Sequence, residues 1–193
     1  MSKPRILLDM DEVLVDFVAG ACAVHGTTKE ALHKVQVPGH WDIRHPLAVT
    51  KHVLEVSQEE FWQPINDNGE RFWTELALLP WAYCVIDLLN KYTDDWYVVS
   101  SPSRSVFSHS GKVKYLKGLF GHDYDRFVLT PHEHLFANAN TILIDDNGKN
   151  VGNFRRHGGK ALLFASMGND LHEYRDDPVK QLEYDLDLLL GAH

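Results

Sequence analysis

The sequence predicts an α/β protein with a doubly wound, Rossmann-like parallel sheet and a small helical cap inserted after the first strand. Three observations lead to this fold class. Five short apolar runs end in small or acidic residues, helical patterns alternate with these runs, and a long segment, residues 10–95, separates the first run from the second. Strands of a parallel sheet are covered on both faces, so they read as continuous apolar runs rather than as alternating ones.

The predicted strands begin with Ile6-Leu7-Leu8, which is apolar at successive positions and leads directly into Asp9. The other four runs have the same character and are rich in Val, Ile, Leu, Phe and Tyr. We predict strands over residues 5–9, 96–100, 126–130, 141–145 and 160–164.

Helical patterns lie between these strands, and the last of them starts with Pro178, a residue suited to the first turn of a helix. We predict helices over residues 83–92, 105–120, 149–157 and 178–190. Strands that alternate with helices indicate a parallel sheet with helices on both faces.

The segment between the first two strands is far longer than a single crossover helix requires. We therefore predict a small, mostly helical cap over residues 17–80 and a core domain made of residues 1–16 and 81–193. A larger helical layer without any role in binding is the alternative. Ligands of open α/β sheets bind beyond the carboxyl ends of the strands, where this insert begins. The segment is rich in aromatic residues, namely Phe17, Trp41, Phe61, Trp62, Phe72 and Trp73.

Composition narrows the classes of partner and compartment. The chain has 193 residues, a formal net charge of −8 and no basic run, so polymeric nucleic acid is not an expected partner. Cys22 and Cys84 lie far apart and lack metal-ligand spacing, which is typical of a reducing compartment. The apolar run near the N-terminus is too short for a signal peptide or a membrane span. We expect a cytoplasmic protein that does not associate with membranes.

Two clusters of acidic residues follow predicted strands. The first contains Asp9, Asp11 and Glu12, and the second contains Asp145 and Asp146. Neighbouring carboxylates repel one another unless they bind protons or a cation lies among them. Oxygen ligands suit a hard divalent cation such as Mg²⁺. The alternative is two independent acidic turns, but two such clusters in one parallel sheet can converge above the same edge.

A serine pair and a lysine complete the pattern. Ser100 and Ser101 end the second predicted strand, where hydroxyl and backbone N–H groups can hold a phosphate oxygen. Lys112 lies in the following helix and can neutralise phosphate charge. Taken alone, a Ser-Ser-Pro turn and a solvated surface lysine are ordinary features.

The order of acid pair, serine, lysine and acid pair on successive α/β elements resembles the haloacid dehalogenase superfamily of phosphatases over nearly the whole chain. Within it, the sequence is most similar to the 5′(3′)-deoxyribonucleotidase family, which also has a helical cap after the first strand. The stretches that carry this resemblance are Leu8-Asp9-Met10-Asp11, Asp16-Phe17, Glu75-Leu76 with Leu79-Pro80, Ser100-Ser101-Pro102, Lys112 ahead of Phe120-Gly121, Val128-Leu129-Thr130, and Ile144-Asp145-Asp146.

The resemblance implies catalytic and metal-binding roles for the acids. Asp9 would attack phosphorus and form an aspartyl-phosphate, while Asp11 would protonate the leaving alcohol and then activate water. Mg²⁺ would be held by Asp9, by the backbone carbonyl of Asp11 and by Asp146, with Asp145 in support.

The same resemblance implies how the substrate would be held. Ser100, Ser101 and Lys112 would bind the phosphate oxygens. An aromatic face can stack on a nucleobase, although each of these rings can equally belong to the core of the cap. The residues that align loosely with the family's nucleoside pocket are Phe17, Trp41 and Trp62.

Two departures from the family pattern bear on the substrate. Glu12 stands where glycine is commoner, and Glu133 lies where basic residues are usual and brings negative charge toward a phosphate. The adjacent His132 and His134 can substitute partly when protonated, and a separate metal site at these two histidines is a further alternative.

We therefore expect an Mg²⁺-dependent phosphatase of small-molecule phosphate esters, with nucleoside monophosphates first among them. The alternatives are a phosphatase of another small ester or of a nucleic-acid end, a phospho-receiver signalling domain, and a binding protein without catalysis. Exposed aromatic residues of the cap make a homodimer an additional expectation.

Overall fold

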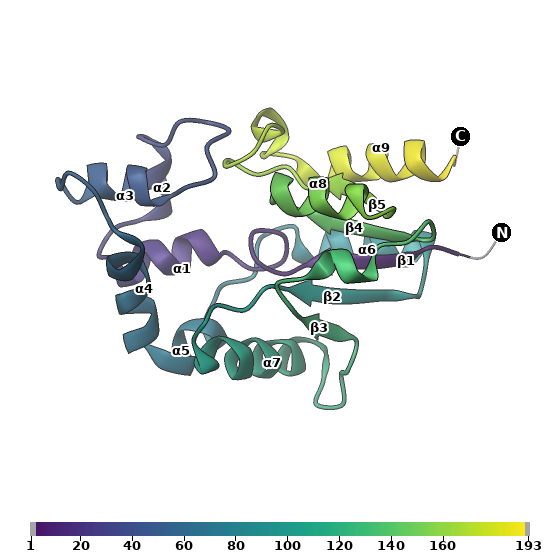
Figure 1. Cartoon of the computed structure of the whole chain (residues 1–193), viewed down its shortest axis with the longest axis horizontal. Coiled ribbons are helices and arrows are strands. Elements are labelled where there is room, and N and C mark those ends of the chain that lie inside the picture. The colour runs from purple at the N-terminus through teal and green to yellow at the C-terminus, as the bar shows by residue number, and fades with distance from the viewer. Residues whose placement is uncertain (1–2, 192–193) are drawn as a thin grey trace.

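A computed structural model describes residues 3–191 and contains a five-stranded parallel sheet with the strand order β3-β2-β1-β4-β5. Helices cover both faces of this sheet, so the predicted doubly wound α/β fold is confirmed (Figure 1). The strands are β1 (Arg5–Asp9), β2 (Trp96–Ser100), β3 (Phe127–Leu129), β4 (Thr141–Asp145) and β5 (Lys160–Leu163).

Strands β1, β2 and β4 have the predicted bounds, whereas the two edge strands are shorter than predicted. β3 lacks residues 126 and 130, and β5 lacks residue 164. An edge strand pairs with one neighbour only, so its ends lose ladder hydrogen bonds first. Pairing nevertheless extends past both strands, because the Thr130 N–H donates to Ser100 O at 2.9 Å and the Phe164 N–H donates to Asp145 O at 3.0 Å.

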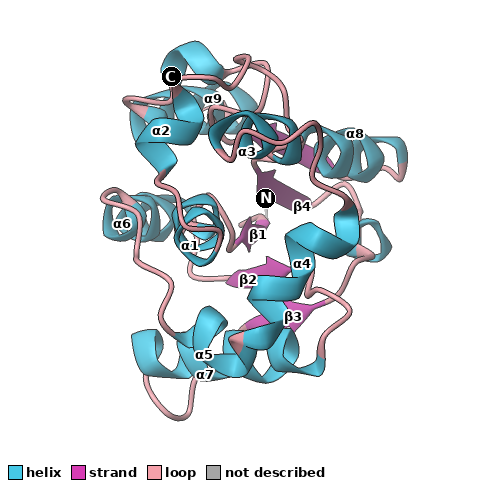
Figure 2. Ribbon diagram, turned by 90° about the vertical axis from the view of Figure 1, so that its left-hand side faces the viewer, coloured by secondary structure: helices cyan, strands magenta, loops and turns pink. Residues whose placement is uncertain are grey.

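The helices of the core lie where the sequence predicts them, with bounds that differ by at most one residue. The face of the sheet that carries Ile6 and Leu8 packs against α6 (Ala82–Tyr92), α7 (Val106–Phe120) and α9 (Pro178–Leu190). The opposite face, which carries Leu7, packs against α8 (Gly148–Arg156). Figure 2 shows the sheet end-on between these two sets of helices.

Besides α6, five helices lie between β1 and β2. Helices α1–α4 extend beyond the end of the sheet, whereas α5 lies beside α7 (Figure 1). The division into a core and a cap over residues 17–80 stays a prediction. The helices are α1 (Phe17–Val24), α2 (Lys29–His33), α3 (Arg44–Thr50), α4 (Gln58–Asp67) and α5 (Gly69–Thr74), and two short 3₁₀ helices, η1 (Glu133–Phe136) and η2 (His172–Tyr174), follow later in the chain.

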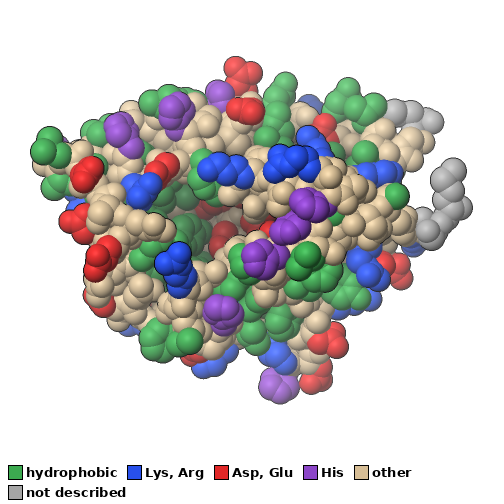
Figure 3. Space-filling model, viewed as in Figure 1, with side chains coloured by type: hydrophobic (Ala, Val, Ile, Leu, Met, Phe, Trp, Pro, Cys, Tyr) green, Lys and Arg blue, Asp and Glu red, His purple; other side chains and the backbone are tan. Residues whose placement is uncertain are grey.

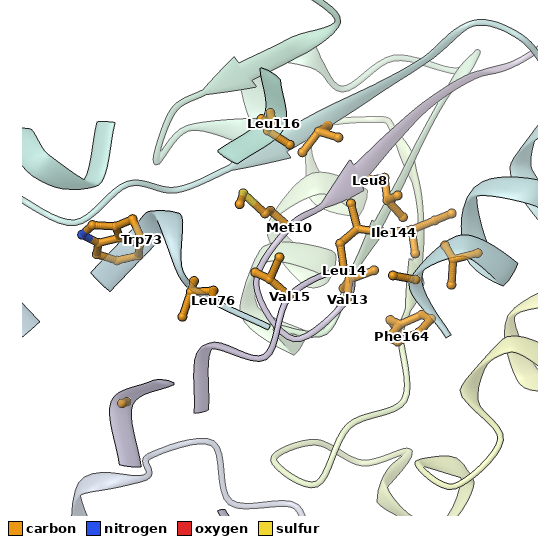
Figure 4. Close-up of a cluster of buried hydrophobic side chains, with 14 of the residues drawn as sticks. Leu8, Met10, Val13, Leu14, Val15, Trp73, Leu76, Leu116, Ile144 and Phe164 are labelled. Carbon is orange, nitrogen blue, oxygen red and sulfur yellow. The ribbon is translucent and has the colours of Figure 1, made fainter. Parts of the chain in front are cut away.

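The turn after β1 is anchored in the hydrophobic core. Met10, Val13, Leu14 and Val15 are fully buried, and Figure 4 shows them packed beside Leu8 and other core residues. The Leu14 N–H donates to Met10 O at 2.9 Å, which closes the turn. Tight packing and internal hydrogen bonds therefore hold the acidic residues between these positions in a defined place.

Among residues 3–191, no helix combines the length and the apolar character that crossing a membrane requires.

Candidate active site

Three carboxylates meet where β1 and β4 end. One oxygen each from Asp9, Asp145 and Asp146 lies within 4.8 Å of the others. Strand pairing explains the convergence, because β1 and β4 are neighbours in register, with Leu8 opposite Ile144. Carboxyl ends of parallel strands share one edge of a sheet, as the sequence predicts for these acids.

Burial and mutual repulsion weaken the ionisation of these acids. Burial raises the pKa of Asp9 well above its usual value, and the charge of Asp145 raises it further. The pKa of Asp146 is raised in the same way, first by burial and then by Asp145. Burial also raises the pKa of Asp145 to about 6, although the backbone N–H of Asn147, which donates at 2.7 Å, and the side-chain amide of Asn150, which donates at 2.9 Å, oppose this shift.

The donor set fits a hard divalent cation. Oδ2 of Asp146 is buried and has no hydrogen-bond partner among the described residues. A buried carboxylate oxygen without a partner is costly, and a cation bound among the three carboxylates would satisfy it and relieve the repulsion. Residues 3–191 contain no other group of three acidic, histidine or cysteine ligands at comparable spacing.

Beside the three carboxylates, the partly exposed carboxylate of Asp11 forms an ion pair with the buried Lys112. The Nζ atom of Lys112 donates to Oδ2 of Asp11 at 2.6 Å and to Oγ of Ser100 at 2.9 Å. The same Nζ atom lies 5.0 Å from the centre of the Trp73 ring. Lys112 has 0% of its surface exposed, and neither Lys112 nor Ser100 lines the adjoining cavity, whereas Ser101 does.

A cavity of about 630 Å³ opens above the acids, and acidic side chains are visible inside the hollow in Figure 3. This volume lies in the range of small-molecule sites. The three aromatic residues singled out from the sequence, Phe17, Trp41 and Trp62, all line the cavity. Trp41 has 45% of its surface exposed. The ring of Phe17 instead packs against neighbouring aromatic rings, and its centre lies 6.1 Å from that of Trp62.

Sequence reasoning missed several residues that line this cavity. Ser166 and Met167 follow β5 and Lys149 follows β4, so attention to every strand end would have found them. Gln36 and Gln58 carry no comparable signal in the sequence, because only the packing of the segment between β1 and β2 brings them to the wall. His33 is a further lining residue of this kind. Glu12, Phe61 and Trp73 also line the cavity, and the sequence singled them out as an acid and as aromatic residues without assigning them to the site.

The segment after β3 lies apart from the cavity. Glu133 is only 6% exposed and does not line the cavity, so it does not face a bound ligand there. Burial raises the pKa of its carboxyl group. The rings of His132 and His134 lie 5.9 Å apart and the ring of His157 lies 4.6 Å from that of His134. These histidines do not form a three-ligand group, so the alternative of a second metal site lacks the geometry it needs.

Comparisons with known proteins identify the fold but not a closer relationship. No family model matches the chain, and no curated protein sequence matches it. Solved structures do match over nearly the full length. A haloacid dehalogenase-like hydrolase from Bacteroides fragilis shares 14% identity, with 92% of this chain and 94% of that chain covered and a TM-score of 0.56.

Two further structures give the same result. A HAD family hydrolase from Deinococcus radiodurans R1, solved with bound phosphate and sodium, shares 13% identity, covers 98% of this chain and 96% of that chain, and has a TM-score of 0.56. A haloacid dehalogenase-like family hydrolase from Streptococcus pneumoniae shares 20% identity and has a TM-score of 0.54. The match covers 94% of this chain and 98% of that chain. The chain therefore has the fold of the haloacid dehalogenase-like hydrolases. The resemblance to deoxyribonucleotidases stays a prediction.

Proposed function

We propose that the protein is an Mg²⁺-dependent phosphomonoesterase that forms an aspartyl-phosphate on Asp9 and acts on small phosphate esters, foremost nucleoside monophosphates. One observation carries the proposal. Asp9, Asp145 and Asp146 converge within 4.8 Å in a cavity whose lining includes five Phe and Trp side chains. The fold shared with haloacid dehalogenase-like hydrolases supports the same chemistry.

The proposed cation site uses Asp9, Asp146 and the backbone carbonyl of Asp11, with Asp145 in support. Asp145 suits the supporting place, because its two oxygens already accept hydrogen bonds from Asn147 and Asn150. Asp146 suits direct ligation, because its Oδ2 has no such partner. When bound, Mg²⁺ supplies positive charge that offsets the carboxylates and the phosphate oxygens.

The first proposed step forms a bond between a carboxylate oxygen of Asp9 and phosphorus and breaks the bond between phosphorus and the ester oxygen. Asp11 gives its proton to that leaving oxygen. In the second step Asp11 takes a proton from water, whose oxygen attacks phosphorus and releases Asp9 and inorganic phosphate. Division into two displacements lowers the barrier that a single hydrolysis would face.

Lys112 and Ser100 have a supporting place in this scheme. The contact of 2.6 Å between Nζ of Lys112 and Asp11 favours the ionised carboxylate, so a bound phosphate would have to take over the ammonium group before Asp11 acts as the acid. Of the serine pair only Ser101 lines the cavity, which supports a direct contact between its hydroxyl group and a phosphate oxygen. Preorganised charge of this kind is the main contribution that proteins make to phosphoryl transfer.

The aromatic wall favours nucleoside monophosphates among phosphate esters. Trp41 lines the cavity and has 45% of its surface exposed, which supports stacking of a base on its ring. Base–aromatic stacking contributes on the order of 1–3 kcal/mol. The other rings in the wall are Phe17, Phe61, Trp62 and Trp73.

Phosphate release from a panel of nucleoside monophosphates and sugar phosphates, with Mg²⁺ and with a chelator, tests the proposal. Selective release from nucleotides supports the whole proposal, and release confined to other esters removes the nucleotide part. We predict that Asp9→Asn folds normally and loses activity by at least about a thousandfold, because an amide cannot act as the nucleophile. An Asp9→Asn protein with normal turnover would contradict the mechanism.

A further inference from the structure

Glu12 has a backbone conformation that favours glycine. Its φ is +57°, and among residues 3–191 only one other non-glycine residue, His52 with a φ of +56°, has a positive value. A side chain raises the energy of this left-handed conformation, which glycine adopts freely. Because a residue kept in such a conformation must be held by its surroundings, the contacts of the Glu12 side chain indicate what it does.

Both carboxylate oxygens of Glu12 have partners in the segment between β1 and β2. The backbone N–H of Val18, in the first turn of α1, donates to Oε1 at 2.8 Å. The Nζ atom of Lys29, the first residue of α2, donates to Oε2 at 2.9 Å and to Oδ1 of Asp16 at 2.7 Å. The side chains of Glu12, Asp16 and Lys29 are each less than one-fifth exposed, so water screens these charges only weakly.

These contacts connect the acidic turn to one wall of the cavity. Asp11 directly precedes Glu12, Val18 lines the cavity from α1, and His33 lines it from α2 at the other end of the helix that Lys29 begins. Two short helices with few hydrogen bonds of their own are therefore tied to the turn that carries Asp9 and Asp11.

We propose that Glu12 is a positioning residue, which through Val18 and Lys29 sets the place of the α1–α2 wall relative to Asp11. This role depends on the proposed phosphatase function only in the kinetic measurements that test it. A leaving alcohol that fills the cavity must reach Asp11 in the correct orientation, and small misplacements of reacting groups lower rates strongly. A small ester that does not reach the wall has no such requirement.

The variant Glu12→Gly separates a positioning role from a role in forming the turn. It removes the carboxylate and its contacts, while glycine adopts the positive φ of the turn more easily than glutamate does. We expect an unfolding temperature equal to or above that of the wild type. We also expect kcat for a nucleoside monophosphate to fall about tenfold or more, with a loss below about threefold for p-nitrophenyl phosphate. Glu12→Gln keeps an acceptor for the Val18 N–H but loses the ion pair with Lys29, so it should recover part of the lost kcat.

Two further variants complete the design. His52→Gly relieves positive φ at an exposed position that does not line the cavity, so it should raise stability without any change in kcat. Lys29→Met should lower kcat for the nucleotide, and this loss should be smaller in the Glu12→Gly background, because the contact between Lys29 and Glu12 is already absent there and only the contact with Asp16 remains to be lost. If Glu12→Gly does not fold, Lys29→Met with the same two esters decides the question.

Amide hydrogen exchange provides a readout that does not depend on activity. Glu12→Gly should speed exchange at Val18 and the rest of the first turn of α1, while α6 keeps its wild-type protection. Wild-type kcat on both esters together with unchanged exchange at residues 17–20 would overturn the proposal and leave Glu12 as a turn residue. If the wild type hydrolyses no ester, the proposed function fails, but the exchange experiment still decides the role of Glu12.

Discussion

The charged side chain of Lys112 is fully buried, and its neighbours explain how the fold stabilises this charge. Asp11 and Ser100 accept hydrogen bonds from Nζ, and the ring of Trp73 lies 5.0 Å away. A buried charge is tolerated only when opposite charge and hydrogen bonds surround it. The alternative of a solvated surface lysine is therefore excluded, and Lys112 is a buried partner of Asp11.

His25 illustrates a second effect of burial at this scale and leads to a prediction on pH. Its Nε2 atom lies 3.0 Å from Phe61 O, its ring stacks on the Phe61 ring, and burial lowers its pKa from 6.5. Below about pH 6.5 the unfolded chain binds this proton more readily than the folded chain does, so the free energy of unfolding falls as the pH falls.

His25→Gln removes the titrating ring but keeps a donor for the Phe61 carbonyl. The free energy of unfolding of this variant should therefore depend less on pH between about pH 7 and about pH 5 than that of the wild type. Urea unfolding of both proteins at several pH values measures the difference. Equal slopes in the two proteins would show that His25 does not contribute to acid destabilisation.

At the scale of elements, α5 and α7 approach each other more closely than a side chain at the contact would allow. A Cβ atom at Gly111 would lie 2.5 Å from Cβ of Trp73 and 3.1 Å from Glu70 O. This approach brings the Trp73 ring over the ammonium group of Lys112. The lack of a side chain at Gly111 therefore lets α5 bring Trp73 close to Lys112, the residue that pairs with Asp11.

Gly111→Ala should push these two helices apart. We expect a loss of about 1–3 kcal/mol in the free energy of unfolding, as is typical of overpacking. Activity should fall as well, because Trp73 moves away from Lys112. Gly118→Ala is the matched control in the same helix, where the added Cβ meets no atom within 4 Å.

The control should stabilise the protein by roughly 0.5–1 kcal/mol, since alanine is a better helix former than glycine. Urea unfolding of the two variants measures both effects. If Gly111→Ala and Gly118→Ala destabilised the protein by similar amounts, the close contact between α5 and α7 would not be the reason for glycine at position 111.

At the scale of the whole molecule, a net charge of −8 and a buried group of carboxylates oppose the compact state. A cation bound at the ends of β1 and β4 would offset this repulsion. Because the site exists only in the folded chain, the cation would stabilise the folded state. The expected homodimer stays a prediction at this scale. Exposed apolar residues of the segment between β1 and β2 include Trp41, Val53 and Leu54.

We predict that Mg²⁺ raises the unfolding temperature of the wild type but not that of Asp146→Asn. At a concentration of 100 times Kd, the stabilisation is about 2.7 kcal/mol. For a chain of this size it corresponds to roughly 5–10 °C. Without metal, Asp146→Asn should be the more stable protein, because one of the mutually repelling carboxylates is gone.

Thermal unfolding with Mg²⁺ and with a chelator measures this effect, and Asp170→Asn, at an exposed acid, serves as the control. An equal Mg²⁺-dependent rise in the wild type and in Asp146→Asn would place the binding site elsewhere.

Much of the fold and of the acidic centre could be predicted from the sequence, because both depend on local patterns. Continuous apolar runs locate β1, β2 and β4 with their observed bounds, and acids at the ends of β1 and β4 locate the carboxylate group. The rule that parallel strands end at one edge needs no knowledge of packing. Edge strands β3 and β5 were predicted too long, because the loss of one neighbour is not visible in composition.

Only the tertiary structure decided how the segment between β1 and β2 meets the core. The sequence by itself determined the sheet, its helices and the positions of Asp9, Asp11, Asp145 and Asp146 at strand ends. The contact of Trp73 with Lys112, the bonds of Glu12 to Val18 and Lys29, and the exclusion of Glu133 from the cavity depend on residues far apart in the chain or on irregular segments. Helix period and strand composition are local properties, whereas these contacts are set by how whole elements pack against one another.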